Sequence, residues 1–174
     1  MKKIVKKIIS LSMCICMMMA FTVGASAAGP ATTWGSPANA RHWFNKSNSK
    51  GYMNAYKWTR AEVVEGTKVT SYIYQDDVTQ KFYTSSGKIK CAANTSLSIA
   101  EVYDDTYHSY AAYLMLTNYG NNSFSIQSYD NGYRIFTSDG QNVLTAIGEM
   151  NSSVPLIFAN KNYEEINDTV WVLH

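Results

Sequence analysis

The sequence contains few cysteines and few charged residues, and both shortages limit what the protein can be. Only Cys91 lies beyond the first 16 residues, so the main part of the chain cannot hold an internal disulfide and must be stabilised by its core. Charged residues make up 16% of the 174-residue chain and apolar residues 46%, a balance that favours a packed domain over a disordered chain. The sequence also has no glycine-rich phosphate loop, no Gly-x-Ser-x-Gly motif and no histidine spacing typical of zinc sites. We therefore predict that it has no catalytic residue, no cofactor and no metal.

The N-terminus has the pattern of a secretory signal peptide. Its first seven residues hold four of the 15 basic residues, and an apolar run from Ile8 to Gly24 ends at Ala25-Ser26-Ala27. A basic start, a moderate apolar segment and an Ala-x-Ala sequence are typical of an export signal, and the run is short for a membrane span of about 20 residues. We predict a signal peptide over residues 1–27, an extracellular protein and no membrane span. The basic start and the lack of disulfides are typical of a Gram-positive bacterial export product.

Without this segment the chain keeps 147 residues, 11 basic and 13 acidic, with a net charge of about −2. This predicts one domain and argues against nucleic acid as a partner. Residues 28–49 are predicted to form an N-terminal arm with a short helix. Ser36-Pro37 has the pattern of an N-cap followed by proline at the first helical position. We expect a helix over Ala38 to Asn45, with Trp43 and Phe44 facing the core.

Beyond residue 50 the sequence shows short alternating runs of β-branched and aromatic residues instead of helical periodicity. Val69 to Tyr74 and Ala111 to Thr117 are examples, and turn pairs such as Asn131-Gly132 and Asp139-Gly140 separate such runs. Asn-Gly and Asp-Gly tolerate positive φ and favour hairpins. Many short strands with regular turns predict an all-β fold.

The predicted strands recur with a nearly constant period. Three aromatic residues near strand ends, Phe82, Phe124 and Trp171, are 42 and 47 residues apart. Three apolar triplets are 44 and 47 residues apart, and they are Met53-Asn54-Ala55, Leu97-Ser98-Ile99 and Leu144-Thr145-Ala146. Two independent landmarks therefore predict three pseudo-repeats of about four strands each, which close around a shared axis where the three rings meet. Closure removes exposed sheet edges.

The order of landmarks in the first pseudo-repeat, from Met53-Asn54-Ala55 through Gly66-Thr67 and Tyr72 to Gln80-Lys81-Phe82, resembles one repeat of the ricin-type β-trefoil lectin domain. That family's repeat ends in Gln-x-Trp. Here only the first ending keeps the Gln and only the last, Thr169-Val170-Trp171, keeps the Trp. The resemblance implies a single β-trefoil over residues 50–174. It also implies a non-catalytic, lectin-like protein. With the predicted signal peptide, we expect a secreted protein whose partner is an extracellular or cell-wall glycan.

The resemblance further implies a shallow sugar pocket in each repeat. A carboxylate and amides would hold the sugar hydroxyls, and an aromatic ring would stack on the apolar face of the sugar. In the first repeat, Asn54 occupies the acidic position, Tyr72 the stacking position and Gln80 the closing position. Asp77, on the loop before Gln80, can supply the carboxylate that Asn54 lacks.

The other two repeats depart further from the family pattern. The second has Ser98 at the acidic position and no closing Gln, which predicts that it holds no working pocket. The third has Thr145 at that position, Phe158 as the expected stacking residue and Asn167 near its end. The expected carbohydrate-binding residues are therefore Asn54, Tyr72, Asp77, Gln80, Phe158 and Asn167.

Three further groups have both a structural and a functional interpretation. Cys91 is expected to be a small buried residue rather than a nucleophile. The pairs Asp76-Asp77 and Asp104-Asp105 are expected to be solvated loop carboxylates rather than calcium ligands or glycosidase acids. A group of tyrosines is expected either to enter the core or to form a binding surface, and its members are Tyr103, Tyr107, Tyr110 and Tyr113.

A second function of a different class stays open. The chain can be a protein-binding module, such as a secreted protease inhibitor or a toxin accessory component, with a secreted or host protein as its partner. The weak match at the sugar-binding positions favours this alternative.

Overall fold

The computed structural model describes residues 35–47, 49–55 and 63–174, and the regular secondary structure of this part of the chain is almost entirely β-strand. Its strands are β1 (Arg41–Asn45), β2 (Tyr52–Ala55), β3 (Thr67–Tyr72), β4 (Lys81–Ser85), β5 (Lys88–Cys91), β6 (Asn94–Asp104), β7 (Ser109–Leu116), β8 (Phe124–Tyr129), β9 (Gly132–Thr137), β10 (Asn142–Thr145), β11 (Ile157–Asn160) and β12 (Val170–Leu173). Short 3-10 helices are η2 (Pro37–Asn39), η3 (Val78–Gln80) and η4 (Ile166–Thr169). No helix in the described ranges is long and apolar enough to cross a membrane. The predicted signal peptide lies outside these ranges.

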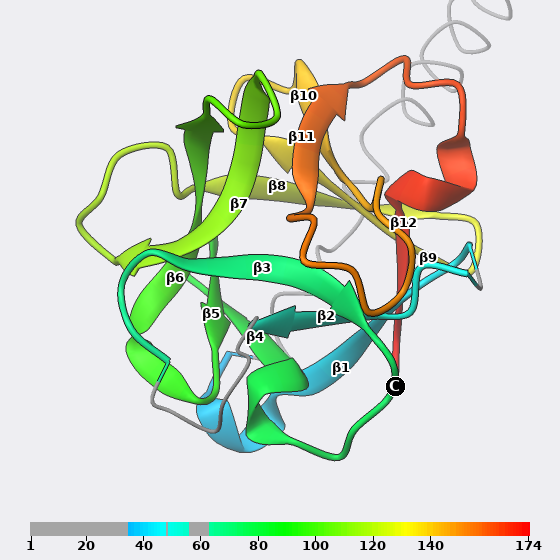
Figure 1. The fold of residues 1–174 in the computed structure, drawn as a ribbon. Helices are drawn as coiled ribbons and strands as arrows, with labels where there is room; N and C mark the ends of the chain where they lie inside the picture. The colour runs from blue at the N-terminus through cyan, green and yellow to red at the C-terminus, as the bar shows by residue number, and fades with distance from the viewer. Residues whose placement is uncertain (1–34, 48, 56–62) are drawn as a thin grey trace, which may run out of the picture.

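The strands fall into three groups of four, β1–β4, β5–β8 and β9–β12, and the outer members of each group form a barrel. Strand β1 pairs with β4 and with β12, β4 pairs with β5, β8 with β9, and β9 with β12. A hydrogen bond of 2.8 Å from the Phe124 amide to the Gly87 carbonyl oxygen joins β8 to the turn before β5. Figure 1 shows the blue β1 beside the red β12, where the first and last strands meet.

The inner members of each group form three hairpins, β2–β3, β6–β7 and β10–β11. Strand β7 pairs with both β3 and β11, and a bridge between Thr70 and Pro155 connects the first hairpin to the third. The three hairpins therefore meet one another as the repeats predict. This arrangement of a barrel and three hairpins is a β-trefoil.

The core contains the aromatic residues that the period identified. Phe82 and Trp171 are fully buried, Phe124 is 8% exposed, and all three belong to one hydrophobic cluster. The indole Nε1 of Trp171 donates a hydrogen bond to the Leu144 carbonyl oxygen at 3.2 Å. The three rings therefore belong to one shared core.

The helix expected over Ala38 to Asn45 is wrong. Only η2 forms near the start of that range, and Ser36 makes no side-chain capping hydrogen bond to it. The chain becomes extended at Ala40, and residues Arg41–Asn45 form β1 instead. Pairing of Trp43 with Leu173 and of Phe44 with Val172 gives this backbone the hydrogen bonds that a helix would have supplied. Strand β1 thus belongs to the barrel, although it lies in the segment expected to be an arm.

A buried polar residue stands two positions before each of the three core rings. These residues are Gln80, Asn122 and Thr169. Gln80 Oε1 accepts a hydrogen bond from the Gln75 amide and Gln80 Nε2 donates one to the Ile73 carbonyl oxygen, both at 2.7 Å. Gln80 therefore holds the loop between β3 and β4 as a hairpin-closing residue.

We expect Gln80→Ala to lower the free energy of unfolding by about 1–3 kcal/mol, because it leaves two backbone groups of this loop without their partners. Urea unfolding monitored by tryptophan fluorescence measures the change. Gln141→Ala removes an exposed amide of the same kind and should have almost no effect. Equal stability of the Gln80 and Gln141 variants would show that Gln80 does not hold the loop.

Candidate functional site

The outward side of the β2–β3 hairpin carries two of the residues predicted for the first repeat. Cross-strand partners in an antiparallel pair point to the same side of the sheet. The register pairs Tyr52 with Tyr72 and Asn54 with Thr70, so these four residues share one side, which we call the outer face. The intervening Met53 points the other way and is fully buried in the core.

The loop between β3 and β4 packs against the outer face. Asp77 caps η3 by accepting a hydrogen bond from the Thr79 amide at 2.8 Å. The Thr79 hydroxyl then donates to Asn54 Oδ1 at 3.3 Å. Asn54 is therefore 6% exposed, whereas the side chain of Asp77 lies at the surface. Asn54, Tyr72 and Asp77 lie on this hairpin and its loop, and so does Gln80, but Gln80 is fully buried and both atoms of its amide are bound to the loop backbone.

An aromatic platform adjoins the outer face, and sequence reasoning missed most of it. Tyr52 lies at its centre, with ring centroids 4.8 Å from Phe44, 5.1 Å from Tyr74 and 5.8 Å from His174. The His42 ring lies 5.1 Å from that of Tyr74. Tyr74 is 54% exposed, so one side of the platform is open to a ligand.

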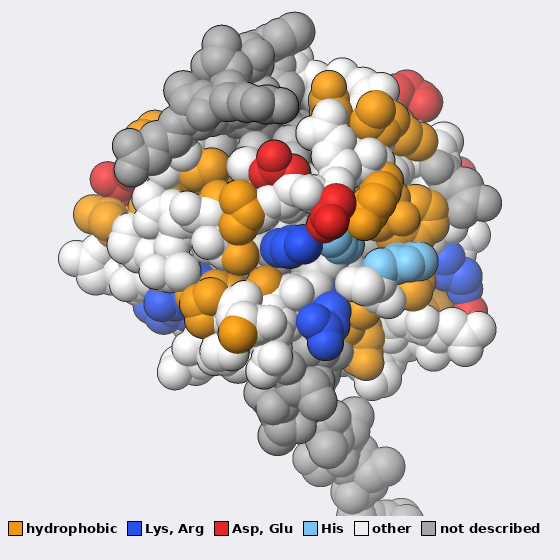
Figure 2. Space-filling model, turned by 90° about the horizontal axis from the view of Figure 1, so that it is seen from below, with side chains coloured by type: hydrophobic (Ala, Val, Ile, Leu, Met, Phe, Trp, Pro, Cys, Tyr) orange, Lys and Arg blue, Asp and Glu red, His pale blue; other side chains and the backbone are white. Residues whose placement is uncertain are grey.

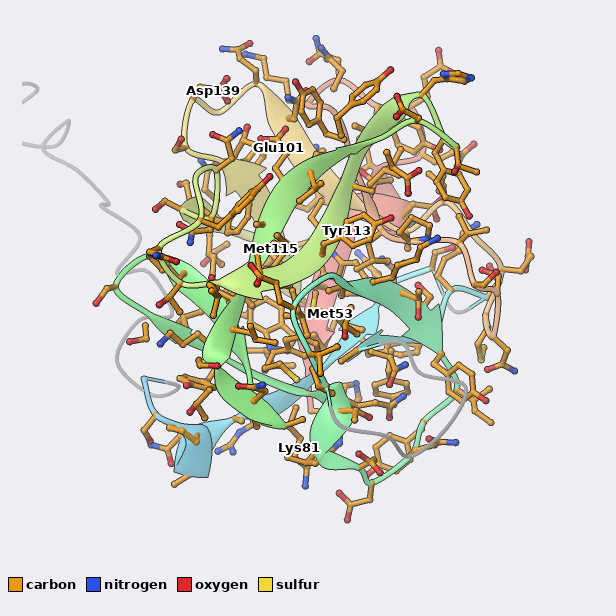
Figure 3. All side chains as sticks on the ribbon, turned by 60° about the vertical axis from the view of Figure 1, so that its left-hand side comes forward. Met53, Lys81, Glu101, Tyr113, Met115 and Asp139 are labelled. Carbon is orange, nitrogen blue, oxygen red and sulfur yellow. The ribbon has the colours of Figure 1, made fainter. Side chains whose placement is uncertain are left out.

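Opposite charges lie at the edge of the platform. Lys81 Nζ is 2.8 Å from Asp76 Oδ1, and His42 Nε2 is 3.9 Å from the same oxygen. The hydrogen bond from Lys81 lowers the pKa of Asp76, so this carboxylate stays ionised. Figure 2 looks onto this side of the molecule, where acidic, basic and histidine side chains lie together among hydrophobic ones. Figure 3 shows Lys81 at the lower end of the molecule.

Two buried polar atoms at this site have no hydrogen-bond partner among the described residues. They are Thr70 Oγ1, on the outer face, and His42 Nε2, in the platform. Burial is the main cause of a lowered pKa at His42, followed by the charge of Lys81, so the imidazole is held neutral. Native proteins satisfy most buried polar atoms, so an internal water is the partner expected for these two atoms, which lie beneath the surface.

The lowered pKa of His42 predicts a pH dependence of stability. The unfolded state takes up a proton on His42 near its ordinary pKa of 6.5, but the folded state does so only at lower pH. Folding is therefore disfavoured as the pH falls below about 6.5. Urea unfolding at pH 7.5 and pH 5.5 should show a larger loss for the wild type than for His42→Gln, which cannot titrate. The same loss in both proteins would contradict this assignment.

The register shows which positions in the other repeats correspond to Tyr72. Tyr72 lies two residues beyond Thr70, the partner of Asn54. Ser98 pairs with Met115 and Thr145 pairs with Ile157, so the corresponding positions are Thr117 and Ala159. Neither carries a ring, and the aromatic position is filled in the first repeat alone.

The expectation that Phe158 stacks on a sugar in the third repeat does not fit the structure. Phe158 is 4% exposed and its ring stacks in parallel on that of Phe124, with centroids 5.4 Å apart. The alternation of β11 places it on the core side, one residue before the position that corresponds to Tyr72. Asn167 lies exposed in η4.

Part of the missed site had a signal in the sequence. Tyr72-Ile73-Tyr74 alternates, so Tyr74 continues the side of Tyr72, and Tyr52 lies two residues before Asn54. His42 and His174 had no such signal. They meet because β1 pairs with β12, and backbone hydrogen bonds link the two histidines in both directions.

The other candidate groups are structural or local. Cys91 is buried in the core, as expected, and burial raises the pKa of its thiol to about 11. It is therefore a poor nucleophile.

Asp104 accepts hydrogen bonds from the Tyr113 hydroxyl and the Thr106 amide. The four candidate tyrosines lie on the long β6–β7 hairpin and its turn. Tyr103 and Tyr110 are about half exposed, whereas Tyr107 and Tyr113 are less exposed.

Comparison with known proteins identifies the fold but gives no family by sequence. No protein-family model and no curated protein sequence matches the chain. Among solved structures, the Rhizoctonia solani agglutinin is similar over 80% of this chain and 94% of its own, with 18% identity and a TM-score of 0.59. A ricin B-like lectin from Macrolepiota procera, in complex with lactose, is similar over 77% of this chain and 93% of its own, with 14% identity and a TM-score of 0.58.

A third similar structure is a mosquitocidal holotoxin. It matches 78% of this chain with 15% identity and a TM-score of 0.60, but the match spans only 17% of the toxin. Together these structures show that the chain has the β-trefoil fold of ricin-type lectins.

Proposed function

We propose that the protein binds carbohydrate without catalysis, through the outer face of the first repeat and the adjoining aromatic platform. The observation that carries this proposal is the exposed ring of Tyr74, packed on Tyr52, beside the outer face that holds Tyr72 and Asn54. A sugar ring has an apolar face of C–H groups that packs on an aromatic ring, and hydroxyls that pair with amides and carboxylates. The ionised Asp76 and the exposed Asp77 supply acceptors at the edge of the platform.

We also propose that the protein is exported and acts on an extracellular or cell-wall glycan. The basic and apolar N-terminal segment supports export. The lactose in the Macrolepiota lectin makes β-galactosides the first ligands to test. Because only the first repeat has an aromatic ring at the position of Tyr72, we expect the trefoil to hold one weak sugar site of the ricin type rather than three.

A glycan array with the purified protein, followed by competition with free sugar, tests the proposal. We expect retention on one class of glycan and release by millimolar concentrations of the matching free sugar. Absence of binding to every glycan on the array would contradict the proposal.

The alternative is a protein-binding module, which the missing rings at Thr117 and Ala159 favour. A protein partner captured from culture medium and held in the presence of free sugar would support this alternative against the lectin. The two functions are therefore separated by one competition experiment.

A further inference from the structure

A second candidate site lies between the second and third repeats, away from the aromatic platform. It is a cleft of about 280 Å³, and its walls are formed by the β6–β7 hairpin, the start of β8 and the β9–β10 turn. Its lining includes Glu101, Tyr110, Asn121, Asp139 and Asn142. Figure 3 shows Glu101 on β6 and Asp139 on the neighbouring turn, on the same side of the molecule.

Two carboxylates share the cleft, and none of the described residues that line it is a lysine, arginine or histidine. The Thr137 hydroxyl and, more weakly, the charge of Lys161 lower the pKa of Asp139. Asp139 accepts hydrogen bonds from the Thr137 hydroxyl at 2.6 Å and the Gln141 amide at 3.0 Å, which hold its side chain in place. Within the described residues, the Glu101 carboxylate has neither a hydrogen bond nor an ion pair, although its side chain is partly buried. Burial, followed by the charge of Asp139, raises the pKa of Glu101. The cleft thus holds negative charge that a bound cation would offset.

The remaining walls suit a polyhydroxylated ring. Tyr110 is 45% exposed, and the Tyr103 ring holds it edge-on at a centroid distance of 5.4 Å. Asn121 and Asn142 contribute amide groups to the lining. The Glu101 amide donates to the Asn121 carbonyl oxygen at 2.9 Å, which fixes the loop against β6. A fixed ring and amides beside two carboxylates form a small, preorganised polar site.

We propose that this cleft binds an amino sugar, with the protonated amine at Glu101 and Asp139 and the sugar ring against Tyr110. The cleft is small, which limits the ligand to about one monosaccharide unit. Glu101 pairs with Ala112, two residues from the buried pair of Ile99 and Leu114, so it lies on the core side of the β6–β7 hairpin. The site of the first repeat lies on the opposite, outer side of its own hairpin. The inference does not rest on the proposed function of that first site.

Calorimetric titration with glucosamine, glucose and Nα-acetyl-lysine amide at about pH 6.5 tests the proposal. We expect glucosamine to bind at least tenfold more tightly than glucose, which lacks the ammonium group, and more tightly than the lysine derivative, which lacks the sugar ring. Glu101→Gln keeps the shape of the side chain but removes its charge, and should weaken glucosamine binding at least tenfold. Glu164→Gln changes an exposed glutamate just before η4 and should bind glucosamine like the wild type.

Tyr119 provides a further control, because it is an exposed tyrosine that belongs to neither site. Tyr119→Ala should leave glucosamine binding unchanged. Failure of the cleft is read from Glu101→Gln and failure of the first site from Tyr72→Ala with the array glycan, so the two are distinguishable. Three results would overturn the proposal: equal affinity for glucosamine and glucose, unchanged binding by Glu101→Gln, or binding of the lysine derivative as tight as that of glucosamine. The thermal unfolding of Glu101→Gln, measured in parallel, shows whether the variant is folded.

Discussion

Replacing Trp171 by alanine should lower the free energy of unfolding by about 3–5 kcal/mol, as for other large buried aromatic residues. Its ring is fully buried in the cluster that also contains Phe82 and Phe124. The substitution removes a fully buried ring from this cluster and also the hydrogen bond from Nε1 to the Leu144 carbonyl oxygen. Because these three rings come from three different repeats, the variant should loosen the whole trefoil rather than one hairpin. Urea unfolding monitored by circular dichroism measures the loss.

Tyr119→Ala is the matched control for this experiment. Tyr119 is 38% exposed on the loop after β7, so its replacement should change stability by less than about 0.5 kcal/mol. A loss of less than about 1 kcal/mol for Trp171→Ala would contradict a core in which the three repeats meet at this ring.

Replacing Tyr74 or Tyr72 by alanine should weaken glycan binding at least tenfold, or about 1.4 kcal/mol, while the protein stays folded. Tyr74 is the most exposed tyrosine of the platform, and Tyr72 shares the outer face with Asn54. Each substitution removes a flat apolar surface on which a sugar can stack, and each leaves the core cluster intact. Binding isotherms with the best ligand from the glycan array measure the effect.

The same Tyr119→Ala variant serves here, because it removes an exposed tyrosine elsewhere on the surface. It should bind the glycan like the wild type. If Tyr72→Ala and Tyr74→Ala also bind like the wild type, the sugar site lies elsewhere on the molecule.

The fold was predictable because its period is carried by large buried residues. Phe82, Phe124 and Trp171 recur at similar separations because each fills the same position in the core of its repeat. The start of the first repeat was not predictable in this way. Residues Arg41–Asn45 have the local pattern of a capped helix, but their partner is β12, more than a hundred residues further along the chain. Local propensity does not report such a contact.

The site was predictable only where it follows strand alternation. Asn54 and Tyr72 lie where the first repeat suggested, because their strands pair in a regular register. In the third repeat the segment before β11 contains Pro155, and a shift of one residue exchanged the core and outer sides of the strand. Phe158 was therefore placed on the wrong side. The platform histidines come from opposite ends of the described chain, and only the closed barrel brings them together.

Chemical-shift mapping of the ¹⁵N-labelled protein during titration with the glycan found on the array locates the sugar site. We expect the largest shifts in β2, the end of β3 and the loop to β4, around Tyr52, Tyr72 and Tyr74. Shifts confined to the second and third repeats, with the signals of these tyrosines unchanged, would contradict this expectation.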